Sequence, residues 1–263
     1  MNKKIKFIDR IYNKPITCLT AYSGSVAKIL DGCVDMILIG DSLGSTLYNM
    51  KNTQGVTLEM MKMHGKAVTT NVKKSITIID MPYKSYTTKL KALKSAKELL
   101  NYSKANILKL EISKKSIPII DYLSKKKFNV IAHIGVTPQS YSDFKKIKVV
   151  GRNEFESKKL LNLALDAERA GAKAILLECV IESLSKKITS ALSIPTIGIG
   201  SSKFCDGQVL VFDDIVSINN TENLPKFVKK YLDLEQQMKK AVRKFSKEVK
   251  LRKFPSKKSV SYT

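Results

Sequence analysis

The sequence predicts an α/β fold, a parallel (β/α)8 TIM barrel, within a chain of 263 residues. Three observations lead to this prediction. Short runs rich in β-branched residues recur eight times, helical patterns lie between most of them, and most runs end close to a polar side chain. A strand followed by a helix, repeated over about 200 residues, is the pattern of a closed parallel barrel. One such barrel is a normal size for a single domain.

The eight predicted strands are bounded by Gly, Pro or Asp, the residues that commonly end a strand. Each run is short and apolar, as expected for a strand that is buried on both faces of a parallel sheet. They cover residues 16–22, 36–42, 75–82, 107–113, 129–135, 174–180, 195–201 and 208–214.

The clearest helical pattern follows the fifth predicted strand, in the stretch NEFESKKLLNLALDAERAG. Asn153 is placed to cap this helix, Glu156 to complete a capping box, and Gly171 to end it. Residues 222–263 add basic helical segments and a polar tail after the repeat. No linker-like stretch separates a second domain, so we expect residues 1–263 to form a single domain.

The formal charge of +24 raises the question of a nucleic-acid partner. Of the 47 basic residues 42 are Lys and only 5 are Arg, and the lysines are spread over nearly the whole chain. Arg is the side chain best suited to fork onto phosphates and bases. The composition therefore favours lysines on solvated surfaces, and a basic nucleic-acid-binding protein is the less favoured alternative.

Composition also limits the cellular setting that we expect. No apolar run approaches the roughly 18–20 residues that span a bilayer, and the start MNKKIKFIDR lacks the apolar stretch of a secretory signal. Four widely spaced cysteines and two histidines argue against a disulfide framework or a zinc site. We therefore expect a cytoplasmic protein that binds neither membrane nor nucleic acid.

Polar side chains collect at the carboxyl ends of the predicted strands, where barrel enzymes carry their chemistry. Several lie within apolar runs, where an unpaired charge is costly to bury. Lys109 and Glu111 are two residues apart in one strand and therefore face the same side. The residues expected together at the barrel mouth are Asp41, Ser42, Asp80, Lys109, Glu111, His133 and Glu178.

These residue types suggest a metal-assisted reaction. Carboxylate oxygens without His or Cys suit Mg²⁺, and the candidate ligands are Asp41, Asp80 and Glu111. Glu178, which ends the sixth predicted strand, is the candidate general base. His133 fits either a contact with substrate or a hydrogen bond in the core. Each acid taken alone also fits a structural role, because ion pairs perturb buried carboxylates as well.

Two predicted connections after strands are unusually long, at residues 43–56 and 136–152. Connections of more than about 12–15 residues are often functional. Because both follow strands, both lie on the predicted active-site face, and we expect the second to act as a lid.

The motifs of this chain closely resemble those of the ketopantoate hydroxymethyltransferase (3-methyl-2-oxobutanoate hydroxymethyltransferase) family. The matches occur in the order of the family and cover roughly residues 15–231. They read LTAYSGSVAKILD, ILIGDSLG, GVTLEMMKMHGKAV, IIDMPYKSY, LKLE, VIAHIGVTPQS, LLECV, IPTIGIGSSKFCDGQVLV and LPKFVKKY.

The resemblance implies a barrel of the phosphoenolpyruvate/pyruvate type and a cytoplasmic homo-oligomer, commonly a decamer. It implies transfer of a hydroxymethyl group from 5,10-methylenetetrahydrofolate to 3-methyl-2-oxobutanoate with Mg²⁺, giving 2-dehydropantoate in pantothenate biosynthesis. A related Mg²⁺-dependent C–C or P–C lyase is the alternative enzyme. By the same resemblance Asp41, Asp80 and Glu111 match metal positions, Asp41, Ser42, Asp80 and Lys109 match oxo-acid positions, and Glu178 matches the catalytic base.

Overall fold

The computed structural model describes residues 14–143, 148–218 and 224–256. The chain divides into two compact units, Met1–Val211 and Phe212–Thr263. Among the described residues, the first unit contains the eight strands of the sheet and the second contains two helices. The single-domain organisation expected from the sequence stays a prediction.

The eight predicted strands form a closed parallel barrel, in which each strand pairs with its neighbours in sequence and β1 pairs with β8. The predicted fold class is therefore confirmed. The strands are β1 (Ile16–Thr20), β2 (Met36–Ile39), β3 (Ile76–Asp80), β4 (Ile107–Glu111), β5 (Val130–Gly135), β6 (Ala174–Glu178), β7 (Thr196–Ile199) and β8 (Gly207–Leu210).

The barrel interior is filled by every second residue of the strands, as the two-residue period of a strand requires. Ile76 and Ile78 of β3 belong to this core, and so does Ile131 of β5. The same alternation carries Asp80 and His133 to the next inward position on their strands. The chain thus changes from apolar to polar within one barrel interior, on approaching the carboxyl ends of its strands.

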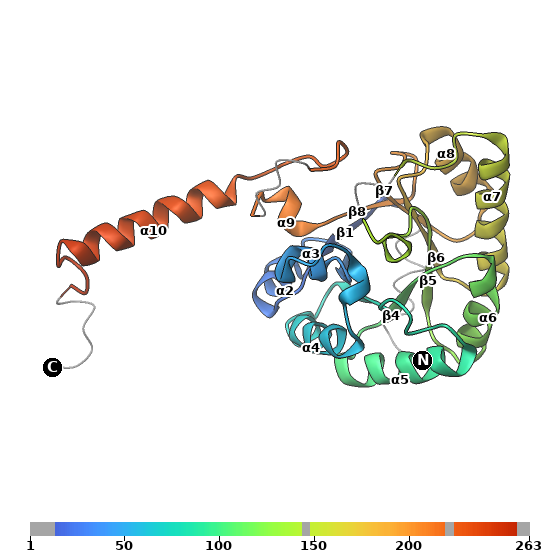
Figure 1. Cartoon of the computed structure of the whole chain (residues 1–263), viewed down its shortest axis with the longest axis horizontal. Coiled ribbons are helices and arrows are strands. Elements are labelled where there is room, and N and C mark those ends of the chain that lie inside the picture. Colours follow the sequence, from blue (N-terminus) through green and yellow to red (C-terminus); the bar gives the residue numbers. More distant parts are fainter. Residues whose placement is uncertain (1–13, 144–147, 219–223, 257–263) are drawn as a thin grey trace. The chain divides into compact units, whose positions relative to one another are not determined.

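Helices follow one another around the outside of the strands, and Figure 1 shows α4 to α8 in this arrangement. In the described residues, short 3₁₀ helices lie in the loops at η2 (Thr53–Gly55), η3 (Lys114–Ser116) and η4 (Pro138–Ser140). The α-helices in the described part of the first unit are α2 (Gly24–Leu30), α3 (Leu43–Tyr48), α4 (Leu58–Thr69), α5 (Lys89–Ser103), α6 (Ile117–Lys125), α7 (Glu154–Arg169) and α8 (Glu182–Ala191).

The cap of α7 confirms one half of the predicted capping box. The Asn153 side chain accepts a hydrogen bond from the Glu156 backbone N–H at 2.8 Å, and Gly171 follows the helix with a φ of +93°. The Glu156 carboxylate, however, accepts from the backbone N–H groups of Gly151 at 3.0 Å and Arg152 at 3.3 Å. It therefore secures the chain that leads into the helix, and the reciprocal bond to the cap residue predicted from the sequence is wrong.

Residues 200–206, between β7 and β8, form turns and no helix, because seven residues are too few for a helix with two connections. One further expectation differs from the structure. The stretch 43–56 is not a long loop, since it contains α3 and η2. The other long connection, 136–152, contains η4, and its residues 144–147 lie outside the described residues.

The second unit contains α9 (Phe212–Ile215) and α10 (Leu234–Lys250). The Asp233 side chain caps α10 by accepting from the Gln236 N–H at 3.1 Å. The predicted strand over residues 208–214 ends at Leu210, and its last residues begin α9. None of the helices in the described part of the chain combines the length and apolar character that a membrane span requires.

Candidate active site

The strand register brings the predicted polar residues together at the carboxyl end of the barrel. Asp80 of β3 stands opposite Lys109 of β4, and Glu111 of β4 stands opposite His133 of β5. Glu178 ends β6, whose register with β5 places it opposite Gly135. All five predicted residues on these strands therefore lie on adjacent strands of one barrel mouth.

An ion pair joins the third and fourth strands in this mouth. The Lys109 Nζ atom lies 2.8 Å from Asp80 Oδ1, and both side chains are almost fully buried. The other oxygen of the same carboxylate, Oδ2, accepts a hydrogen bond from the backbone N–H of Asp41 at 3.0 Å. Asp80 thereby fixes the turn that follows β2 as well as the lysine.

His133 lies between the lysine and two carboxylates. Its Nδ1 atom is 3.4 Å from Lys109 Nζ and 3.8 Å from Glu111 Oε1, and its Nε2 atom is 3.2 Å from Glu178 Oε2. The last contact is close but is not aligned as a hydrogen bond. Burial lowers the pKa of His133, and the neighbouring Lys109 charge lowers it further, so this imidazole is neutral at pH 7.

Ser42 lies half-buried directly after Asp41 at the end of β2, and its hydroxyl is held in place by a tyrosine. The Tyr22 hydroxyl, from the segment that follows β1, lies 2.7 Å from Ser42 Oγ. The predicted neighbours Asp41 and Ser42 therefore belong to the same mouth, and Tyr22 is a supporting residue that the sequence did not single out.

The site also contains a glutamine that the sequence did not indicate. Gln139 lies in η4, in the connection after β5, and is buried. It donates hydrogen bonds to Asp41 Oδ2 at 2.7 Å and to Glu111 Oε2 at 2.9 Å, the second from its backbone N–H. Its sequence signals were its place shortly after a strand end and its inclusion in the motif VIAHIGVTPQS. Neither signal assigns a role to an uncharged amide in a loop.

Negative charge exceeds positive charge in this buried region. Desolvation and the Asp80 charge raise the pKa of Asp41 to about 7, and desolvation with the Asp41 charge raises the pKa of Glu111 well above its usual value. Burial acts to lower the pKa of Lys109, but the neighbouring carboxylates outweigh it and raise that pKa. Asp41, Asp80 and Glu111 thus face a single buried ammonium, so a proton or a further cation is needed to offset their charge.

The donor geometry is open, without a complete metal cage. Within the described residues no three His, Cys, Asp or Glu side chains form a ready-made cluster around one point. Asp80 Oδ1, although paired with Lys109, receives no aligned hydrogen bond from the described residues. A cation that keeps several waters and needs one or two carboxylates fits such a site better than one that needs a closed shell.

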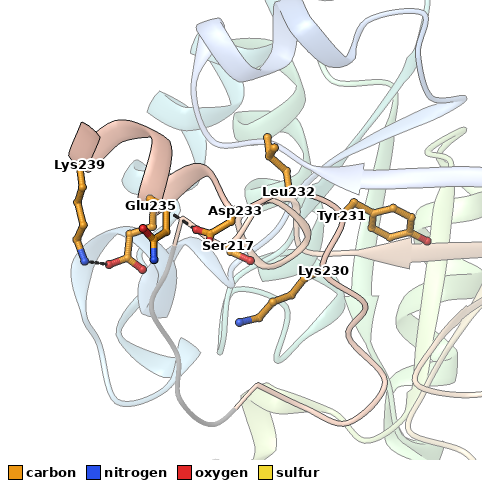
Figure 2. Close-up of a pocket in the computed structure, with 8 residues that line it drawn as sticks. Ser217, Lys230, Tyr231, Leu232, Asp233, Glu235 and Lys239 are labelled. Atoms are coloured by element: carbon orange, nitrogen blue, oxygen red, sulfur yellow. Dashed lines mark hydrogen bonds and ion pairs between the residues drawn. The ribbon is translucent and has the colours of Figure 1, made fainter. Parts of the chain in front are cut away.

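A separate hollow lies in the C-terminal unit and shares none of these residues. Figure 2 shows Lys239 directed at Glu235, with which it forms an ion pair, beside Asp233 at the start of α10. No residue predicted for the site lies there. Its lining consists of Ser217, Lys230, Tyr231, Leu232, Asp233, Glu235, Gln236 and Lys239.

A barrel with buried acids, a lysine and a neutral histidine at its strand ends is built as an enzyme active site. Solved structures share the fold. Phosphonopyruvate hydrolase is similar with a TM-score of 0.64 at 11% identity, covering 100% of this chain and 92% of that one. A 2,3-dimethylmalate lyase, described as a PEP mutase/isocitrate lyase superfamily member, has a TM-score of 0.61 at 12% identity, covering 98% and 91%.

Comparisons of sequence identify the family. The model of the ketopantoate hydroxymethyltransferase family matches residues 3–257. The 3-methyl-2-oxobutanoate hydroxymethyltransferase of Pelagibacter ubique is 46% identical over 259 residues, 98% of this chain and 99% of that protein. The protein of the same name from Clostridium botulinum is 41% identical, over 98% of this chain and 95% of its own. This chain belongs to the ketopantoate hydroxymethyltransferase family, as its motifs predicted.

Proposed function

We propose that this chain transfers a hydroxymethyl group from 5,10-methylenetetrahydrofolate to 3-methyl-2-oxobutanoate, giving 2-dehydropantoate for pantothenate biosynthesis. The relatives named above, at 41–46% identity over nearly the whole chain, support the reaction. The observation that carries the proposal is the buried group of Asp41, Asp80, Lys109 and Glu111 at the barrel mouth. Its charges suit a small anionic substrate bound together with a cation.

Mg²⁺ is the proposed metal, and Asp41, Asp80 and Glu111 are the proposed ligands. The excess of buried negative charge around the single Lys109 ammonium supports this assignment. Oxygen donors without thiolates suit a hard cation. When bound, Mg²⁺ supplies a Lewis acid that stabilises negative charge on the ketone oxygen of the oxo acid.

The oxo acid is proposed to lie against Asp41, Ser42, Asp80 and Lys109. The Lys109 ammonium and the Ser42 hydroxyl are suited to the substrate carboxylate, since both donate hydrogen bonds and one is positively charged. Tyr22 supports this role of Ser42 because its hydroxyl, 2.7 Å away, limits the rotation of the serine side chain.

Glu178 is proposed as the catalytic base. Its side chain is 18% exposed, more open than the other acids, and it lies at the end of β6 where a substrate can reach it. It takes the proton from C3 of the oxo acid, and the electron pair left on that carbon forms the new bond to the one-carbon unit of the folate. One water supplies the hydroxyl group, both bonds from the methylene carbon to the folate nitrogens break, and tetrahydrofolate leaves with the protons. The His133 Nε2 atom lies 3.2 Å from Glu178 Oε2, and a direct contact of His133 with substrate stays a prediction.

The remaining expectations concern the setting of the enzyme. We expect a cytoplasmic homo-oligomer, for which the family resemblance is the support. The lid role of residues 136–152 also stays a prediction. The alternative, a Mg²⁺-dependent C–C or P–C lyase, is less well supported, because the hydrolase and lyase structures share the fold at only 11–12% identity.

Incubation of the protein with 3-methyl-2-oxobutanoate, 5,10-methylenetetrahydrofolate and Mg²⁺, followed by identification of the product, tests the proposal. The expected product is 2-dehydropantoate, and its formation should stop when either the folate or Mg²⁺ is left out. Breakdown of an oxo acid without any need for folate would instead support the lyase alternative.

A further inference from the structure

We infer that Gln139 is a positioning residue that fixes the carboxylates of Asp41 and Glu111 in the orientation needed to hold the divalent cation. The inference rests on the proposed function, because it assigns a task to a residue that supports the proposed metal ligands. Gln139 is only 3% exposed, although it lies in a loop. A buried loop amide must find partners for its donors and acceptors, and here these partners are parts of the site.

The side-chain amide of Gln139 connects two strand ends. Its Nε2 atom donates to Asp41 Oδ2 at 2.7 Å and to the backbone carbonyl of Met81 at 3.0 Å. Asp41 follows β2 and Met81 follows β3. Both amide protons are therefore used, one on a proposed metal ligand and one on the backbone that immediately follows Asp80.

The backbone of the same residue reaches a third strand. The N–H of Gln139 donates to Glu111 Oε2, at the end of β4, at 2.9 Å. In each of the two carboxylates, Asp41 and Glu111, one oxygen therefore accepts a hydrogen bond from Gln139. The bond from Gln139 uses Oδ2 of Asp41, and the other oxygen, Oδ1, is assigned to the cation.

The amide of Gln139 is held in one orientation by its partners, and Tyr86 is one of them. The Tyr86 hydroxyl donates to Gln139 Oε1 at 2.6 Å. In the flipped orientation Oε1 would face Asp41 Oδ2 and the Met81 carbonyl. Each of these two contacts would then bring two hydrogen-bond acceptors together with no proton between them. The carboxylate and the carbonyl therefore select one orientation, and Tyr86 completes it by occupying the remaining acceptor.

The loop that carries Gln139 is itself held from the other side of the mouth. Gln54, in η2, donates from Nε2 to the Gln139 backbone carbonyl at 2.9 Å, and Asn52 Nδ2 donates to the Ser142 carbonyl at 3.0 Å. Gln54 contacts no acid of the site through any of these bonds. It provides a matched control, since it is a glutamine in the same network that lacks the proposed task.

Gln139→Met is the variant that isolates the amide. Methionine keeps the length and approximate volume of the side chain, and the backbone bond to Glu111 does not depend on the side chain. Loss of a group that orients a metal ligand typically costs about 10–100-fold in metal affinity or activity. We expect a loss of Mn²⁺ affinity in this range for Gln139→Met, a smaller loss in the same direction for Tyr86→Phe, and wild-type affinity for Gln54→Met.

The test is a titration of each variant with Mn²⁺ at a temperature far below its melting point. The electron paramagnetic resonance signal of free Mn²⁺ measures how much metal stays unbound and thus gives the affinity. Melting temperatures are measured in parallel, because a purely structural role lowers them without changing the affinity of the folded protein. Wild-type Mn²⁺ affinity in folded Gln139→Met overturns the inference, and if that variant does not fold, wild-type affinity in Tyr86→Phe overturns it. Wild-type protein that binds no Mn²⁺ contradicts the proposed metal site itself, which separates the two failures.

Discussion

Replacement of Lys109 by methionine tests whether the charges at the barrel mouth are arranged as described. The ammonium lies 2.8 Å from Asp80 Oδ1, and both side chains are buried. At that distance, with an effective dielectric constant of about 20, the attraction is about 6 kcal/mol before desolvation is counted. Removing one partner of such a buried pair leaves the other charge uncompensated, so we expect a loss of about 3–5 kcal/mol in the free energy of unfolding.

The chain offers a matched control for this substitution. Lys125 and Asp121 form an ion pair at 2.9 Å, nearly the same separation, but their side chains are 72% and 41% exposed. For Lys125→Met we expect a loss below about 1 kcal/mol, since water screens exposed pairs. The two pairs have nearly the same separation and differ in burial and in the further carboxylates beside Lys109. The difference between the variants therefore measures the cost of uncompensated charge in the mouth.

Urea unfolding at pH 7 in the presence of a chelator gives both free energies from the transition midpoints and slopes. Mg²⁺ in excess should then recover part of the loss in Lys109→Met, because it replaces positive charge beside the same carboxylates. A loss in Lys109→Met no larger than that in Lys125→Met would refute the reasoning, since the mouth would then tolerate its carboxylates without a cation.

Three further predictions follow from individual contacts. Glu178→Gln should abolish turnover while leaving oxo-acid binding largely intact, and near-wild-type exchange of deuterium at C3 in this variant would show that another group is the base. Asp80→Asn should weaken Mg²⁺-dependent binding of the oxo acid, and unchanged affinity by calorimetry would remove Asp80 from the metal ligands. Asp31 accepts hydrogen bonds from the backbone N–H groups of residues 73–75. Asp31→Asn should lower the free energy of unfolding of the protein by roughly 1–2 kcal/mol at pH 7. Burial acts to raise the pKa of Asp31, but the three backbone hydrogen bonds outweigh it and lower that pKa. The stability that the ionised carboxylate contributes is therefore present above about pH 4 and is lost as the pH falls further. A loss of stability in Asp31→Asn that is as large at low pH as at pH 7 would contradict this reasoning.

The barrel could be predicted from the sequence because the signals for its strands lie within short stretches of the chain. An apolar run bounded by Gly, Pro or Asp indicates a strand wherever it occurs, and the regular return of such runs indicates a parallel barrel. Asp80, Lys109 and Glu111 were recognisable for a related reason, since a charge inside an apolar run is costly unless it has a partner. The strand register then placed them side by side.

The parts that the sequence missed depend on contacts between distant segments. Nothing in the stretch VTPQS indicates that the amide of Gln139 reaches Asp41, which lies 98 residues earlier in the chain. The sequence predicted that the Glu156 carboxylate accepts from the backbone N–H of the cap residue Asn153. In the structure it accepts from the N–H groups of Gly151 and Arg152, because the path of the preceding loop brings these groups to it. Local propensity does not contain that path, so such choices are visible only in the folded chain.

The most direct test of the proposed function follows the carbon atom that is transferred. 5,10-Methylenetetrahydrofolate labelled with ¹³C in its methylene group is incubated with 3-methyl-2-oxobutanoate, Mg²⁺ and the protein, and the products are examined by NMR. The proposed reaction predicts that the label appears in the hydroxymethyl group of 2-dehydropantoate with the wild-type protein and not with Glu178→Gln. Label that stays on the folate with the wild-type protein, while the oxo acid is left intact or is cleaved, would contradict it.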